Sequence, residues 1–266
     1  MRWRPMHNGQ SLSQPSPGLA IATMGAIIAT LVVNTLSNIY PPGGQNVGQI
    51  ANTTLAGVLI TPANYAFAIW GLIYLGLIAY GIYQIQPSRQ RQRRLQQVNK
   101  LLILACIAQV IWIFLFTLRQ FGWSVLAIVT ILLCLIGVYL TLKTSQLQPL
   151  RRERWMCQIP FSIYLAWISL ATIVNVASAL YASGWKGWGL SPVAWTLVMV
   201  IVATLVAALV IWQRQDVAFT LVFMWAFVAI ALRQSSSTPA IAIAAGLATL
   251  ALLLGLIVVK TRRLSA

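Results

Sequence analysis

The segment IPFSIYLAWISLATIVN, residues 159–175, is apolar enough to cross a bilayer and yet contains a tryptophan and a carboxamide. An unpaired carboxamide is costly to bury in hydrocarbon, so we expect Asn175 to face other helices or a cavity rather than lipid. In a helix, with about 100° per residue, Trp167, Ala171 and Asn175 lie along one side. The segment therefore predicts a transmembrane helix that presents a large ring, a small gap and a polar group to the interior of a helix bundle.

The composition of the whole chain is that of a membrane protein. Of its 266 residues 59% are hydrophobic and only 8% are charged. Soluble domains typically carry about 25% charged residues, so this chain has too little polar surface to be one of them. We predict an all-α protein, a polytopic bundle of transmembrane helices.

Eight apolar runs have the length that a transmembrane helix requires, which is about 20 residues. They are residues 19–39, 65–83, 101–118, 123–142, 159–180, 193–212, 217–232 and 240–259. The seventh run is the shortest, and Asp216 and Arg233 flank it. Gly122 separates the third and fourth runs, and we expect it to be the turn of a tight helical hairpin. Residues 1–17 are polar and are expected to form an N-terminal tail.

The positions of the cations test the number of spans independently. With the N-terminus inside, fifteen of the 18 Lys and Arg residues fall on inner segments, and the three others are Arg119, Lys186 and Arg233. This positive-inside distribution favours eight spans with both termini on the cytoplasmic face. We attribute the net charge of +16 to topology and to anionic lipid headgroups, and expect no nucleic-acid partner.

The chain has few residues suited to catalysis or metal binding. It contains two acidic residues, one histidine (His7) and three cysteines without paired spacing. No general acid, base or nucleophile can be identified, so we predict neither an enzyme nor a metal site. Asp216, near the inner face, is the one candidate for carrying a proton.

Aromatic and amide side chains lie deep in several of the predicted spans. The tryptophans farthest from the predicted interfaces are Trp70, Trp112, Trp167 and Trp225. Gln109 precedes Trp112 by three residues, so the two share part of a helix face. Buried amides such as Gln109 and Asn175 either contribute to a ligand site or join helices, for about 0.6 to 2 kcal/mol each. The sequence leaves both roles open.

Two outer connections also stand out. Residues 40–64 form the longest uncharged connection and contain Pro41, Pro42, Gly43 and Gly44 and several Asn and Gln residues, a composition that suits a lid. The next outer connection carries Trp185 and Trp188, which we interpret as anchors in the headgroup region.

Three motifs make residues 18–182 resemble the TspO/MBR family, the tryptophan-rich sensory proteins. The family's second-span pattern, P-P-x-W-x-F-G-P-x-W-x-x-L-Y, resembles residues 61–74, TPANYAFAIWGLIY. There Tyr65 takes the place of the first Trp, and Phe67, Trp70 and Tyr74 match.

The other two motifs follow in the same order as in the family. The third-span pattern, N-x-x-W-x-x-x-F-F and then Gly-Trp, resembles Gln109, Trp112, Phe116 and the pair at 122–123. The fifth-span pattern, Y-L-x-W-x-x-F-A-x-x-L-N, is matched without a gap by Tyr164, Leu165, Trp167, Leu170, Ala171, Val174 and Asn175.

The resemblance implies a five-helix bundle over residues 18–182, with a ligand cavity capped by the connection between the first two spans. Residues 183–266 would add three transmembrane helices. Ligands of the family are tetrapyrroles such as protoporphyrin and haem, and sterols in some members, and no cofactor is required. Carried over residue by residue, the ligand-binding set would be Tyr65, Trp70, Tyr74, Gln109, Trp112, Phe116, Trp167, Ala171 and Asn175. Arg119 would meet either a porphyrin propionate or a lipid headgroup.

We therefore expect a membrane protein that binds, senses or carries a tetrapyrrole or another flat hydrophobic ligand, including a lipid. Two alternatives stay open: a secondary transporter, and a non-catalytic subunit of a larger membrane assembly that docks through its last three spans. A homo-oligomer is compatible with each of these functions.

Overall fold

A computed structural model describes residues 14–143 and 151–264, and this part of the chain is folded into helices and their connections. It contains eight helices that are long and apolar enough to cross a membrane, as predicted. They are α1 (Pro17–Ile39), α3 (Ile69–Gln84, preceded by the 3₁₀ helix η1, Asn64–Ala68), α5 (Arg93–Thr117), α6 (Phe121–Lys143), α8 (Ile159–Ala182), α9 (Pro192–Arg214), α10 (Val217–Gln234) and α11 (Pro239–Leu264). The short elements are α2 (Val47–Asn52), α4 (Pro87–Gln90), α7 (Arg151–Glu153), the π-helical turn η2 (Arg154–Gln158) and η3 (Gly187–Gly189). The chain is therefore an integral, multi-pass membrane protein.

Most of the predicted polar tail, including His7, lies outside the described residues. Within the described part, α1 begins at Pro17, the last residue assigned to that tail. Proline is well suited to this position because the first N–H groups of a helix have no partner inside it.

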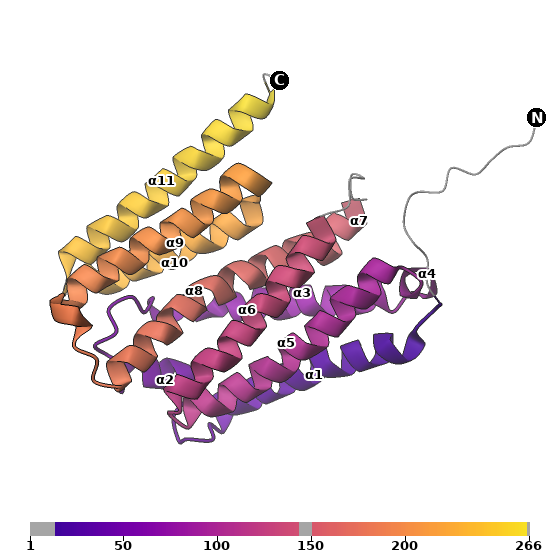
Figure 1. Cartoon of the computed structure of the whole chain (residues 1–266), viewed down its shortest axis with the longest axis horizontal. Coiled ribbons are helices and arrows are strands. Elements are labelled where there is room, and N and C mark those ends of the chain that lie inside the picture. Colours follow the sequence, from indigo (N-terminus) through magenta and orange to yellow (C-terminus); the bar gives the residue numbers. More distant parts are fainter. Residues whose placement is uncertain (1–13, 144–150, 265–266) are drawn as a thin grey trace, which may run out of the picture.

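The first five membrane-spanning helices form a closed ring. α1 contacts α3 and α5, α6 contacts α5 and α8, and α8 completes the ring by packing against α3. Figure 1 shows these helices running roughly side by side, with α2 and its connection at one end of the ring and α4 and α7 at the other.

The last three helices form a second group on one side of the ring. α9, α10 and α11 contact one another, and α10 also packs against α8 and η1. In Figure 1 this group is orange to yellow and lies beside α8. α10, which comes from the shortest apolar run of the sequence, is the most buried of the three and joins the group to the ring.

Side-chain caps fix where the last helices begin. The Ser191 hydroxyl accepts the backbone N–H of Ala194 at 3.1 Å at the start of α9. The Asp216 carboxylate accepts the backbone N–H of Phe219 at 3.2 Å at the start of α10. Such caps satisfy N–H groups that would otherwise lack a partner.

The hairpin between α5 and α6 is present, but its turn is not at Gly122. Gly122 lies inside α6, and the turn is made by residues 118–120, where Arg119 adopts a left-handed conformation with φ of 59°. A non-glycine residue rarely takes this conformation. Here the Arg119 guanidinium is held by hydrogen bonds to the Gly43 carbonyl oxygen at 3.2 Å and to the Gln45 side chain at 2.8 Å.

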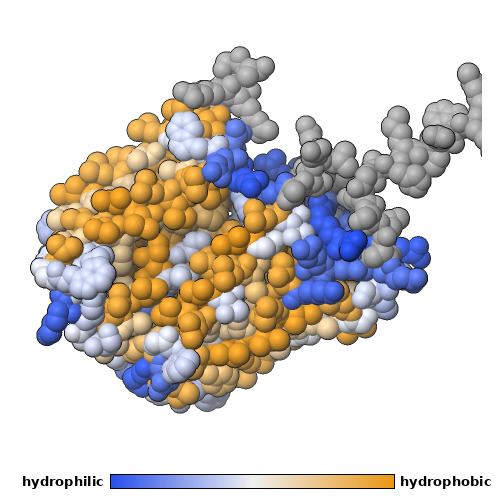
Figure 2. Space-filling model, viewed as in Figure 1, coloured by the Kyte–Doolittle hydropathy of each residue, from blue (hydrophilic) through white to orange (hydrophobic). Residues whose placement is uncertain are grey.

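The charged residues gather at the end of the molecule that carries α4 and α7. Figure 2 shows hydrophilic residues there, next to a wide apolar surface. The two acidic residues of the chain lie at this end and are both paired, Glu153 with Arg94 and Asp216 with Lys143 at 3.2 Å.

Candidate functional site

A cavity of about 300 Å³ lies between the helices of the ring, under the connection between α1 and α3. Aromatic side chains from four helices, α3, α5, α8 and α10, and from η1 reach it. They are Phe67, Trp70, Trp112, Phe116, Trp167 and Phe227. The cavity is therefore mainly apolar, and flat rings form much of its surface.

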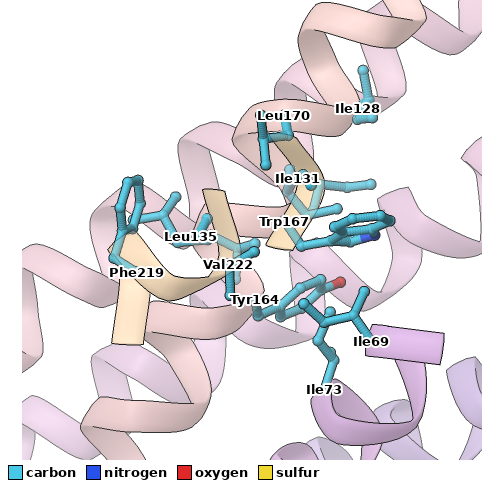
Figure 3. Close-up of a cluster of buried hydrophobic side chains, with 14 of the residues drawn as sticks. Ile69, Ile73, Ile128, Ile131, Leu135, Tyr164, Trp167, Leu170, Phe219 and Val222 are labelled. Carbon is cyan, nitrogen blue, oxygen red and sulfur yellow. The ribbon is translucent and has the colours of Figure 1, made fainter. Parts of the chain in front are cut away.

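Helix α8 presents its predicted side to this cavity. Trp167, Ala171 and Asn175 all line it. Figure 3 shows Trp167 and Tyr164 projecting to the same side of their helix, beside Ile69 and Ile131. Asn175 is only 2% exposed, which confirms that it faces away from lipid.

The Asn175 carboxamide also joins three helices. Its oxygen accepts the indole N–H of Trp112 (α5) at 2.6 Å, and its amide group donates to the Ser124 hydroxyl (α6) at 2.8 Å. Both partners are buried. For Asn175 the two roles that the sequence left open thus coincide, because it lines the cavity and holds the helices around it together.

The aromatic residues near the cavity pack on one another. Trp70 stacks on Tyr74 with 5.5 Å between ring centroids, and Phe67 meets Trp167 edge to face at 6.0 Å. Trp112 packs on Phe116 at 5.1 Å. These contacts fix the orientation of the rings before any ligand enters.

Six of the nine predicted ligand-binding residues line the cavity, and three do not. Tyr65 packs edge to face on Trp225 of α10 at 5.0 Å and is 38% exposed. Tyr74 stacks on Trp70, which lines the cavity, but does not line the cavity itself. Gln109 is fully buried and accepts the Tyr164 hydroxyl at 3.4 Å, so it joins α5 to α8. The structure places these three residues around the cavity but not on its surface.

Polar groups outside the predicted ligand-binding set form the end of the cavity next to α2. They are Asn34, Ser37 and Asn38 from the end of α1, together with Asn46 and Asn64 from the connection. The signal that could have identified them is the uncharged polar cluster at the end of the first apolar run.

The connection between α1 and α3 covers this end of the cavity. Its helix α2 begins with a reciprocal cap, in which Asn46 and Gln49 each accept the other's backbone N–H, at 2.9 and 2.8 Å. Arg119 holds the first part of this connection through its hydrogen bonds to Gly43 and Gln45. The prediction that Arg119 meets a ligand propionate is not supported by the geometry, since its guanidinium is used by the connection and does not line the cavity.

α10 holds the second part of the same connection. The Arg233 guanidinium donates to the Asn52 side chain at 2.8 Å and to the Pro62 carbonyl oxygen at 3.3 Å. Gln234 donates to the Leu59 carbonyl oxygen at 2.6 Å. Arg119 and Arg233 therefore hold two different parts of the connection between α1 and α3.

α10 and α9 also supply part of the cavity wall. Ala226, Phe227 and Ile230 of α10 and Ala203 of α9 line it. No residue of these two helices was predicted to belong to the site. The residues described around the cavity are uncharged, so the arrangement is suited to binding an apolar molecule with a few polar groups at one edge.

Comparison with known proteins gives a family match over most of the chain. A family model described as TSPO-like protein matches residues 20–258. The match extends beyond residue 182 into the last three helices, so the division of the chain into residues 18–182 and 183–266 stays a prediction. No curated protein and no solved structure matches the chain.

Proposed function

Because this chain belongs to the family of TSPO-like proteins, we propose that it is a membrane receptor or carrier that holds a tetrapyrrole or another flat hydrophobic ligand in the cavity. The observation that carries this proposal is the convergence of Trp70, Trp112 and Trp167 from three different helices on one cavity. Flat apolar molecules bind well between aromatic rings, and a few amides suffice to orient a polar edge.

The size of the cavity bears on the ligand. At about 300 Å³ it lies at the lower end of the range for small-molecule sites, which is about 300 to 1,000 Å³. A compact flat ligand fits this space without rearrangement. A complete tetrapyrrole requires the cover, residues 40–64, to move outward, and the hydrogen bonds from Arg119 and Arg233 resist that movement.

The proposal involves binding without a chemical step. The residues around the cavity carry aromatic, aliphatic, hydroxyl and amide groups. These groups can recognise the shape of a ligand and form hydrogen bonds to its edge, but none of them gains or loses a proton near neutral pH.

We also propose that both termini lie on the cytoplasmic face, because cations gather at the end that carries α4 and α7. The native cysteines are buried, so introduced ones can be labelled selectively. With a membrane-impermeant maleimide, Ser183→Cys should react in intact cells, whereas Ser88→Cys should react after permeabilisation. The reverse pattern would contradict this orientation.

Tryptophan fluorescence tests the binding site. In detergent, protoporphyrin IX should quench the fluorescence of the full chain saturably, because three indoles surround the cavity. Ala171→Leu places additional side-chain volume inside the cavity and should weaken quenching, with little effect on the fold. Its matched control is Ala182→Leu, at the exposed end of the same helix.

A second variant separates cavity residues from other tryptophans. Trp167→Ala should reduce the saturable quenching far more than Trp188→Ala, whose indole is exposed on an outer connection. Unchanged quenching in both Trp167→Ala and Ala171→Leu would exclude the cavity as the binding site.

A further inference from the structure

A second hollow, of about 1060 Å³, lies on the outside of the bundle between α3, α8 and α10. It shares no residue with the cavity described above. One end is lined by Lys143, Arg151 and Arg154, and the body by apolar residues that include Leu72, Ile163 and Leu221. We call it the lateral groove.

The cations of the lateral groove outnumber the acidic groups that face them. Asp216 is the one carboxylate that lines it, and its oxygen already accepts from the hydroxyls of Tyr139 at 2.9 Å and Ser162 at 2.7 Å and pairs with Lys143. The other acidic residue of the chain, Glu153, is paired with Arg94. Within residues 14–143 and 151–264, neither Arg151 nor Arg154 forms an ion pair with an acidic side chain, so both exposed guanidinium groups are available to an anion from outside the protein.

The body of the lateral groove is suited to a hydrocarbon chain. Leu72 and Leu221 are about half exposed, and Trp225 is 40% exposed, so the groove offers an apolar surface that opens sideways to lipid. Along α10 it extends from Val217 to Trp225, which at 1.5 Å per residue is roughly 12 Å. At its charged end the exposed indole of Trp155 lies where indoles are commonly found, at the level of lipid headgroups.

We propose that the lateral groove binds an anionic phospholipid. Its phosphate would lie between Arg151 and Arg154, and an acyl chain would follow the apolar body between α3, α8 and α10. Guanidinium groups bind phosphate oxygens in a fork, and basic pockets between transmembrane helices are recognised sites for anionic headgroups. This proposal rests on residues that the proposed function does not use.

Native mass spectrometry of the purified full chain tests the proposal with three probes: dioleoylphosphatidylglycerol, dioleoylphosphatidylcholine and inorganic phosphate. One molecule of phosphatidylglycerol should be retained per chain, with an affinity about tenfold or more above that of phosphatidylcholine. The double variant Arg151→Gln/Arg154→Gln should weaken phosphatidylglycerol binding roughly 30-fold, as expected for the loss of two cations near the headgroup.

The chain offers a matched control for charge. Arg93→Gln/Arg152→Gln removes two exposed cations from the same end of the molecule but outside the groove, and should leave the affinity within about twofold. Ala218→Trp, which fills the groove and keeps its cations, should weaken phosphatidylglycerol binding as well.

Three results would overturn the proposal: equal affinity for the two lipids, an equal loss in the control variant, or binding of inorganic phosphate as tightly as the lipid. Quenching by protoporphyrin IX should be unchanged in Arg151→Gln/Arg154→Gln, which separates a failure of the lipid site from a failure of the cavity.

Discussion

Replacing Asn175 with alanine removes a carboxamide that joins α5, α6 and α8. In the parent protein its oxygen accepts the Trp112 indole N–H at 2.6 Å, and its amide donates to the Ser124 hydroxyl at 2.8 Å. Asn175→Ala leaves that indole N–H without its partner.

The magnitude follows from the number of bonds lost. Hydrogen bonds between membrane helices average about 0.6 kcal/mol and reach about 1.7 kcal/mol. Two such bonds are lost, and the distances are short and the partners buried, which favours the upper half of that range. We expect Asn175→Ala to lower the free energy of unfolding by about 2 kcal/mol, which is roughly a 30-fold change in the folding equilibrium.

Unfolding in mixed micelles with a rising mole fraction of dodecyl sulfate, followed by circular dichroism, measures this change. Asn38→Ala is the matched control, because Asn38 is exposed and its amide bonds to Asn34 of the same helix. A double-mutant cycle of Trp112→Phe with Asn175→Ala should give a coupling energy of about 1 kcal/mol. A coupling energy below about 0.3 kcal/mol would refute the assignment of this bond as a link between helices.

Three other substitutions test the cover and the junction between the helix groups. Arg233→Gln should accelerate amide hydrogen exchange in residues 51–64 about five- to tenfold, because the guanidinium that holds this segment is lost. Gly43→Ala should destabilise the protein to thermal unfolding by about 1 to 3 kcal/mol, because the new Cβ would lie 2.0 Å from the Thr117 carbonyl oxygen. Asp216→Asn should lower the free energy of unfolding by about 2 to 3 kcal/mol, because it removes the charge of a buried, paired carboxylate. The loss is smaller than for a fully buried ion pair because the partner, Lys143, is partly exposed to solvent.

Each of these substitutions has a clear contrary result. Arg214→Gln removes an exposed cation at the last residue of α9 and should leave amide hydrogen exchange in residues 51–64 unchanged. Equal acceleration of exchange in Arg214→Gln and Arg233→Gln would exclude a specific role for Arg233. Gly25→Ala, where the added Cβ meets no atom within 4 Å, should not destabilise the protein. An Asp216→Asn protein as stable as the parent would show that this carboxylate does not hold the helix groups together.

The sequence predicted the spans well because crossing a bilayer imposes length and composition on each of them. Of the four tryptophans expected to lie farthest from the interfaces, Trp70, Trp112 and Trp167 line the cavity, whereas Trp225 lines the lateral groove. On α8, the spacing of Ala171 and Asn175 from Trp167 sufficed to place all three on the cavity. These are local properties of single helices, and a sequence states them directly.

The remaining features depend on how helices face one another, which the sequence does not encode locally. Lipid and protein interior are both apolar, so nothing in the run containing Ala226 and Phe227 distinguishes a cavity wall from a lipid-facing side. Tyr65, which the resemblance placed in the ligand-binding set, packs on Trp225 of α10 and does not line the cavity. Arg233 and Asn52 are in contact although 181 positions separate them in the chain. The residues next to either one in the sequence give no indication of this contact.

The position of α10 has a consequence for any shortened form of this protein. A chain cut after residue 182 would keep the ring of α1, α3, α5, α6 and α8, but the side of its cavity formed by Ala226 and Phe227 would open to acyl chains. The cover would also lose the hydrogen bond between Arg233 and Asn52 that restrains it in the full chain. Bilayer lipid would then compete directly with the proposed ligand, so the C-terminal helices would set how selective the cavity is as well as how large it is.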